Sequence, residues 1–111
     1  MLTKDQILIA DDVKCVELYV PEWGGNVRLR TITGAERDRL EVRVSGDKTG
    51  NNIRAALCAL CICDEKNSRM FSDAEVERLG QKSASALDRI FQAARTLNGF
   101  TDSDIQELEK N

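Results

Sequence analysis

Apolar and polar residues alternate along two stretches of this chain, and the pattern predicts a β-hairpin. In both 13–20 and 26–32, valine, leucine or threonine recurs at every second position, and the segment 21–25 between them contains one proline and two glycines. Such alternation is typical of half-buried strands, whereas proline and glycine interrupt strand pairing and form turns. We therefore expect two antiparallel strands joined by a short loop.

Apolar residues at helical spacing follow the hairpin. Positions 53, 56, 57, 60 and 61 keep an i, i+3, i+4, i+7, i+8 pattern, and 84–97 is the longest amphipathic stretch. Further helices are expected at 34–44 and 72–80, with short ones at 4–10 and 101–109. The sequence thus predicts an α+β fold, a single domain over residues 1–111, in which an N-terminal β-hairpin packs with about four to five short-to-medium α-helices.

Short capping motifs mark where several of these helices begin and end. Thr3, Thr33 and Ser72 are each followed three residues later by Gln or Glu, a spacing that forms reciprocal capping hydrogen bonds. Gly80 and Gly99 follow apolar stretches and suit helix C-termini. Segment 45–52 contains two glycines and no apolar residue, so we expect a mobile loop there.

The composition excludes several classes of function. The chain has 16 Lys and Arg against 19 Asp and Glu, a net charge of −3, whereas nucleic-acid-binding domains are normally basic. It has no histidine, which rules out Ser-His-Asp and Cys-His catalysis and His-ligated zinc. The early apolar run Ile7–Ala10 is too short for a signal peptide or a membrane span. We expect a cytoplasmic protein that is not an enzyme, with no cofactor, nucleic-acid partner or membrane anchor.

Four cysteines are the residues that suggest metal or redox chemistry. Cys58, Cys61 and Cys63 lie close together in the sequence, and a four-cysteine metal site would need Cys15 from the hairpin as its fourth ligand. The alternative is structural, because Cys61 falls on the buried face of the helix predicted at 53–63 and free cysteine packs as a small apolar residue. A redox Cys-x-x-Cys pair normally lies at a helix start rather than near its end. We interpret the cysteines as reduced and structural, with no metal.

Charges and one tryptophan supply the candidate protein-interaction residues. Segment 26–54 carries seven basic against four acidic residues, and segment 101–111 carries one basic against four acidic. Such asymmetry can steer a protein partner or a second copy, but ordinary solvated helix faces are the alternative. The tryptophan at the hairpin turn is either an exposed contact residue or a side chain folded over the hairpin. The candidate interface residues are Trp23, Arg28, Arg30, Arg37 and Arg39.

Several short motifs occur in a fixed order along the chain. They are VPEWGGNV at 20–27, TGAERD at 33–38, DE at 64–65, MFSD at 70–73, LGQKS at 79–83, LNG at 97–99 and EKN at 109–111. Together they resemble the tail assembly chaperones of long-tailed (siphovirus-type) phages and prophages. The resemblance covers most of the chain and is weakest over 45–58. Where that family often has glycine after the Asp-Glu pair, this chain has Asn67, which also adopts a left-handed conformation.

The resemblance implies a non-enzymatic assembly factor in the cytoplasm of the bacterial host. Proteins of this family bind the long tape measure protein, keep it soluble and help recruit the major tail protein. They are typically not kept in the finished particle, and they tend to self-associate. The family has no catalytic residue, so none is transferred to this chain.

The residues also suggest which surfaces would carry such a role. We expect apolar client surface from the helices at 53–63 and 84–97, with Trp23, Arg28, Arg30 and the loop at 45–52 contributing to client contact or self-association. An alternative function is a small structural head–tail joining or tail-completion protein retained in the virion. A third hypothesis is a metal-binding or redox module that uses the four cysteines.

Overall fold

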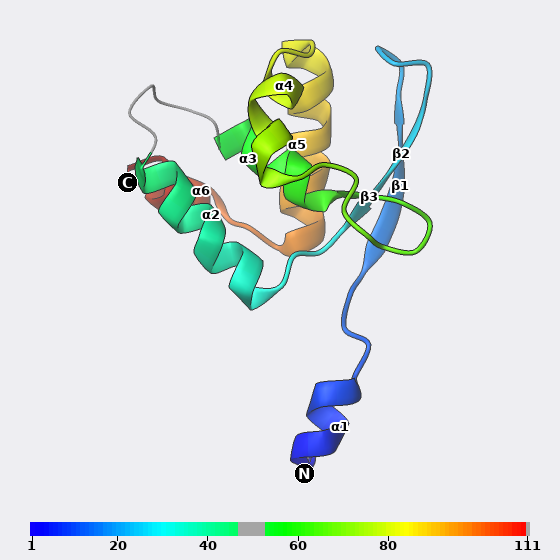
Figure 1. The fold of residues 1–111 in the computed structure, drawn as a ribbon, viewed down its shortest axis with the longest axis vertical. Helices are drawn as coiled ribbons and strands as arrows, with labels where there is room; N and C mark the ends of the chain where they lie inside the picture. Colours follow the sequence, from blue (N-terminus) through cyan, green and yellow to red (C-terminus); the bar gives the residue numbers. More distant parts are fainter. Residues whose placement is uncertain (47–52, 111) are drawn as a thin grey trace.

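Three antiparallel strands with helices packed against one face of them form the body of the molecule (Figure 1). The structure is a computed structural model and describes residues 1–46 and 53–110. The elements are α1 (Lys4–Ile9), β1 (Cys15–Val20), β2 (Gly25–Arg30), α2 (Gly34–Gly46), α3 (Ile53–Cys61), β3 (Ile62–Cys63), the 3-10 helix η1 (Asp73–Glu75), α4 (Val76–Gly80), α5 (Ala84–Asn98) and α6 (Asp102–Lys110). The predicted α+β fold with its N-terminal hairpin is confirmed, and the described residues form six α-helices.

The sheet follows the order β1-β2-β3, so its two faces can be assigned from the register. Leu18 lies opposite Val27, and both pack against the core on the face covered by α5. Glu17 lies opposite Arg28, which in turn lies opposite Cys63, and these residues belong to the outer face. The outer edge of β1 carries no partner strand within the described residues.

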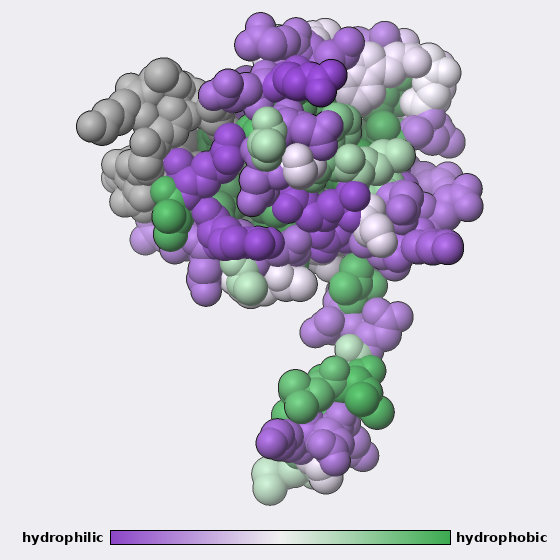
Figure 2. Space-filling model, viewed as in Figure 1, coloured by the Kyte–Doolittle hydropathy of each residue, from purple (hydrophilic) through white to green (hydrophobic). Residues whose placement is uncertain are grey.

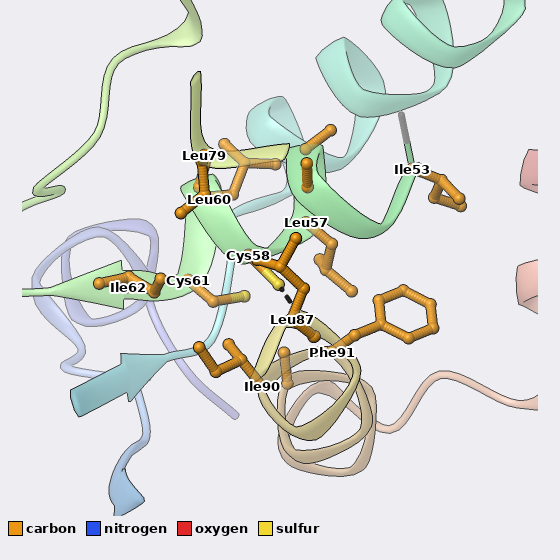
Figure 3. Close-up of a cluster of buried hydrophobic side chains, with 14 of the residues drawn as sticks. Ile53, Leu57, Cys58, Leu60, Cys61, Ile62, Leu79, Leu87, Ile90 and Phe91 are labelled. Carbon is orange, nitrogen blue, oxygen red and sulfur yellow. Dashed lines mark hydrogen bonds between the residues drawn. The ribbon is translucent and has the colours of Figure 1, made fainter. Parts of the chain in front are cut away.

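Helix α3 is the centre of the core. All of its residues except Arg54 are buried, and it packs against α5, α4 and α2. Leu57 and Cys58 of α3 lie toward Leu87 and Phe91 of α5, whereas Leu60 lies beside Leu79 of α4 (Figure 3). The expectation that these two helices supply apolar surface to a client is therefore wrong, because their apolar faces are used against each other.

The capping motifs at the helix starts and at Gly99 behave as the sequence predicts, whereas Gly80 is the last residue of α4 and Gln81 is its C-cap. Thr33 donates its backbone N–H to Glu36 Oε1 (2.9 Å), and Glu36 donates its own N–H to Thr33 Oγ1 (3.1 Å). The same reciprocal pattern is present at Thr3 and Ser72. Gly99 ends α5 in the left-handed region with a φ of 72°. These local signals explain why the predicted helices begin and end close to where the structure has them.

Several boundaries differ from the prediction. The helix expected at 53–63 ends at Cys61, because Ile62 and Cys63 pair with β2 and form β3. The single helix expected at 72–80 is divided into η1 and α4, because a 3-10 turn precedes the α-helical residues. The first strand begins at Cys15, two residues later than expected. The second strand begins one residue earlier than expected, at Gly25, and ends two residues earlier, at Arg30. Helix α2 continues to Gly46, which removes 45 and 46 from the loop predicted at 45–52, and residues 47–52 lie outside the described residues.

Helix α1 projects away from the body of the molecule (Figure 1). None of its residues is buried, and the linker 10–14 connects it to the start of β1. No helix among the described residues is both long and apolar enough to cross a membrane.

Candidate protein-interaction site

The turn of the hairpin is held firmly against α5, and this places Trp23. The N–H of Trp23 donates to the Val20 carbonyl (3.0 Å), and Gly24 takes a positive φ of 68° to complete the turn. Arg89 of α5 donates two hydrogen bonds to Glu22, at 3.2 and 3.3 Å. The Arg89 guanidinium lowers the pKa of the Glu22 carboxyl, so the carboxylate stays charged. The tryptophan beside it is therefore fixed by its neighbours on both sides.

Trp23 is half-buried. The sequence left open whether it is an exposed contact residue or a side chain folded over the hairpin, and the observed burial lies between the two. Its ring packs against the edge of the core and lines an apolar groove of about 310 Å³. We call this the Trp23 groove, and it is lined by Trp23, Phe71, Glu75, Arg78, Leu79 and Lys82. The apolar part of the groove is formed by Trp23 of the hairpin turn, Phe71 just before η1 and Leu79 of α4. Charged side chains form its margin.

The margin of the Trp23 groove is mainly basic. The Glu75 carboxylate is occupied by its capping role, since it accepts the N–H (2.9 Å) and hydroxyl (3.2 Å) of Ser72, and these bonds lower the pKa of Glu75. Arg78 and Lys82 form no ion pair with any described residue. The charge of Arg78 also contributes to the lowered pKa of Glu75, so two cations and one carboxylate border the apolar lining.

Arg28 lies on the outer face of the sheet, where the turn after β3 folds over it. Asn67 occupies the left-handed region (φ 66°), as the sequence predicts, and its Oδ1 accepts from Arg28 Nε (3.1 Å) and from the Cys15 thiol (3.0 Å). An open depression of about 790 Å³ lies between this turn and the sheet. We call it the sheet depression, and its lining is Glu17, Asn26, Val27, Arg28, Cys63, Asp64, Glu65, Lys66 and Met70.

Arg30 is buried rather than displayed. Its side chain is 8% exposed and forms a two-point ion pair with Glu36, at 3.0 and 2.7 Å. Hydrogen bonding to Glu36 raises the pKa of Arg30. Burial raises the pKa of Glu36, but the hydrogen bonds from Arg30 and from the Thr33 N–H lower it by more, so it is lowered overall. Arg30 therefore offers almost no surface to a partner and instead joins β2 to α2.

The remaining two arginines lie on α2. The Arg37 guanidinium stacks 4.7 Å from the centre of the Phe100 ring and bonds Glu41 at 3.2 Å. Arg39 is exposed and lines a separate small hollow between α2, α3 and α4. The five predicted interface residues thus have different surroundings, and the structure does not bring them together into one patch.

The cysteines contribute to packing and not to one shared site. Cys58 and Cys61 are fully buried in α3, and burial raises the pKa of each thiol to about 12. The Cys58 thiol faces the Leu87 carbonyl at 3.6 Å, and Cys61 Sγ accepts from Asn98 at 3.6 Å. Among the described residues, no three or more Cys, Asp or Glu side chains gather in a way that could hold a metal ion. The burial of both side chains confirms that Cys58 and Cys61 pack in the core.

Sequence reasoning missed one apolar surface. Leu2, Ile7, Leu8 and Ile9 in and beside α1 are 72%, 59%, 72% and 81% exposed. The signal was present, since three consecutive apolar residues within a six-residue helix cover more than the one face that a surface helix needs. Phe71 and Leu79 lie in the MFSD and LGQKS motifs, but nothing in the neighbouring sequence indicates that they meet Trp23.

The architecture defines a small α+β domain whose three-stranded antiparallel sheet carries helices on one face. The same fold occurs in the solved structure of the bacteriophage HK97 tail assembly chaperone, with a TM-score of 0.63. That match covers 84% of this chain and 94% of the HK97 chain at 23% sequence identity, so it establishes a shared fold. No protein-family model matches the chain. A search of curated proteins also gives no match.

Proposed function

We propose that this chain is a phage or prophage tail assembly chaperone that binds the tape measure protein and helps recruit major tail subunits, without catalysis, in the cytoplasm of the bacterial host. The observation that carries the proposal is the fold shared with the HK97 tail assembly chaperone over 84% of this chain. The ordered motifs, from the hairpin turn at 20–27 to LGQKS at 79–83, support it from the sequence. The motifs support the proposal at the level of the residues, and the match supports it at the level of the backbone.

The client contact in this proposal is the sheet depression. It has a larger volume than the Trp23 groove, and it combines the Arg28 guanidinium with the exposed side chain of Met70. Tyr19, also exposed, lies opposite Asn26 on the same outer face. Methionine and tyrosine adapt to varied apolar partners, which suits a long helical client. Arg37 and Arg39 lie on α2 and do not line the depression, so in this proposal they are separate contacts. Arg30 is left out because Glu36 already binds it.

A pull-down with a fragment of the tape measure protein from the same phage or prophage tests this function. We expect the parent chain to retain the fragment and to increase its soluble fraction on co-expression. Arg28→Glu should reduce retention by about tenfold, equivalent to roughly 1.4 kcal/mol of binding free energy. Lys14→Glu, an equal charge change at an exposed position outside the depression, is the matched control and should leave retention unchanged.

The outcomes separate the function from the site. Failure of the parent chain to bind or solubilise the fragment contradicts the chaperone function. Unchanged binding by Arg28→Glu, together with unchanged oligomer size for Trp23→Ala, contradicts the assignment of these residues. Mass spectrometry of purified particles tests the alternative of a retained joining or completion protein, which would be present in a fixed ratio to the tail subunits.

A further inference from the structure

Helix α1 and the residues before it form an apolar arm, Met1–Ile9, that the body of the molecule leaves uncovered. Figure 2 shows apolar side chains gathered on this projecting segment, and every large apolar residue in it is more than half exposed. Isolated exposed apolar residues are common on protein surfaces, but a contiguous cluster on one short element marks a contact surface.

Local bonds set the helical form of the arm. Thr3 Oγ1 accepts the N–H of Gln6 (3.2 Å), and Gln6 Oε1 accepts the N–H of Thr3 (2.9 Å). Six helical residues are far fewer than an isolated helix needs to be stable in water. A capped helix of this length, with no buried residue of its own, therefore gains most from a partner that covers its apolar side chains.

The arm cannot reach the Trp23 groove of its own chain. Lys14 is fixed to Thr31 by two bonds, at 2.9 and 3.1 Å, so only residues 10–13 are left to turn the arm around. Fully extended, the chain from Ile9 to Lys14 spans about 17 Å. The strand from Lys14 to Val20 alone spans about 20 Å, and Trp23 lies beyond its far end. The groove and the arm are thus at opposite ends of the hairpin.

The arm and the groove are nevertheless complementary in chemistry. Leu8 and Ile9 at the end of α1 are followed at once by Asp11 and Asp12. The groove presents three apolar side chains beside two cations without ion-pair partners among the described residues, Arg78 and Lys82. The order of apolar and acidic residues on the arm therefore matches the arrangement of apolar and basic residues at the groove.

We propose that the arm of one copy docks in the Trp23 groove of a second copy of this chain. Leu8 and Ile9 lie against Trp23 and Leu79, and the acidic pair beside them faces the basic margin. The occupant is a second copy because one chain carries both complementary surfaces and its own geometry keeps them apart. The proposal concerns contacts between identical chains and does not depend on the proposed function.

Sedimentation velocity of the full chain over a range of concentrations tests the proposal. We expect the parent chain to self-associate, and the double change Leu8→Ser with Ile9→Ser to weaken association by at least about tenfold. At concentrations where the parent is itself monomeric, the thermal midpoint of this variant should equal that of the parent, because neither residue is buried in the body of its own chain. Lys4→Ser alters a polar residue of the same helix and is the matched control, with association expected to equal that of the parent.

Charge exchange tests the groove directly. Arg78→Glu with Lys82→Glu should weaken association by about tenfold, and adding Asp11→Lys with Asp12→Lys to the same chain should restore it. Mixing the Leu8→Ser, Ile9→Ser chain with the Arg78→Glu, Lys82→Glu chain should also restore association, because the mixture contains one intact groove and one intact arm.

Three results would overturn the proposal. They are a parent chain that stays monomeric at all concentrations, an arm variant that associates like the parent, and a charge exchange that restores nothing. If the arm variant loses tape measure binding while self-association is unchanged, the arm belongs to a client protein and the second copy is the wrong occupant.

Discussion

Arg30 and Glu36 bond each other at two points, 3.0 and 2.7 Å, with only 8% and 9% of their side chains exposed. The same Glu36 carboxylate also accepts the N–H of Thr33, the residue that caps α2. One carboxylate therefore fixes both the end of β2 and the start of α2. Because Glu36 makes both contacts, Arg30 is buried between β2 and α2, although the sequence suggests an exposed charge.

Replacing this carboxylate should be costly. Glu36→Gln keeps an oxygen for the Thr33 N–H but leaves Arg30 buried without its counter-charge, and we expect a loss of about 3 kcal/mol in the free energy of unfolding. Urea denaturation measures it. Glu41→Gln removes the negative charge that pairs with Arg37 at the surface and is the control. We expect it to lower the free energy of unfolding by no more than about 0.5 kcal/mol. Equal losses from the two changes would contradict a framework role for Glu36.

Acid should destabilise the fold through the same residue. The folded state lowers the pKa of Glu36 from 4.5, so the unfolded chain takes up its proton first as the pH falls. The contribution of Glu36 to stability is therefore complete above about pH 5 and is lost as the pH falls through its lowered pKa. Urea midpoints from about pH 7 to about pH 3 should decline less steeply for Glu36→Gln than for the parent. Glu22, Glu75 and Asp104, whose pKa values are also lowered, should keep part of the decline.

Alkali should act through the buried thiols. The pKa of Cys58 and of Cys61 rises from 9.0 to about 12, so above pH 9 the unfolded chain releases protons that the folded chain retains. Stability is complete below pH 9 and should then fall by up to about 1.4 kcal/mol per pH unit for each thiol. Burial also raises the pKa of the Cys63 thiol, so Cys58→Ala should reduce this slope without abolishing it. Val76→Ala, which removes core volume without a thiol, should lower stability at every pH and leave the slope unchanged, and any other result would contradict the assignment.

Gly99 should tolerate substitution less well than Gly34. Gly99 ends α5 with a φ of 72°, and no atom lies within 4 Å of the place where a Cβ would be, so alanine there meets backbone strain alone. We expect Gly99→Ala to lower the free energy of unfolding by about 1 kcal/mol. Gly34 opens α2 with equal free space and without a positive φ, so Gly34→Ala should raise stability by about 0.5 kcal/mol. Thermal unfolding compares the two, and a shift of the same sign would count against the strain.

Features set by neighbouring residues could be predicted from the sequence. The reciprocal caps at Thr3, Thr33 and Ser72 need only a hydroxyl and a carboxylate or amide three residues apart. The left-handed Asn67 follows from its place in a short turn, since asparagine tolerates that conformation. The hairpin could be located because alternation and turn residues occur in one continuous stretch.

Features set by distant residues could not be predicted in this way. Arg28 and Arg30 are two positions apart on one strand, yet the first bonds Asn67 and the second is buried against Glu36. Alternation in a strand places both on the same face and does not say which element covers each of them. The Trp23 groove likewise depends on Phe71 and Leu79, which come from much later in the chain.

Trp23 is the chain's single tryptophan, and it lines the groove. Its indole therefore supplies nearly all of the intrinsic fluorescence from one known place. A ligand that covers the half-buried ring removes water from it, so the emission should move to shorter wavelength as the groove fills. The unmodified chain thus carries its own optical reporter, and a titration without any label can measure the affinity of whatever binds there.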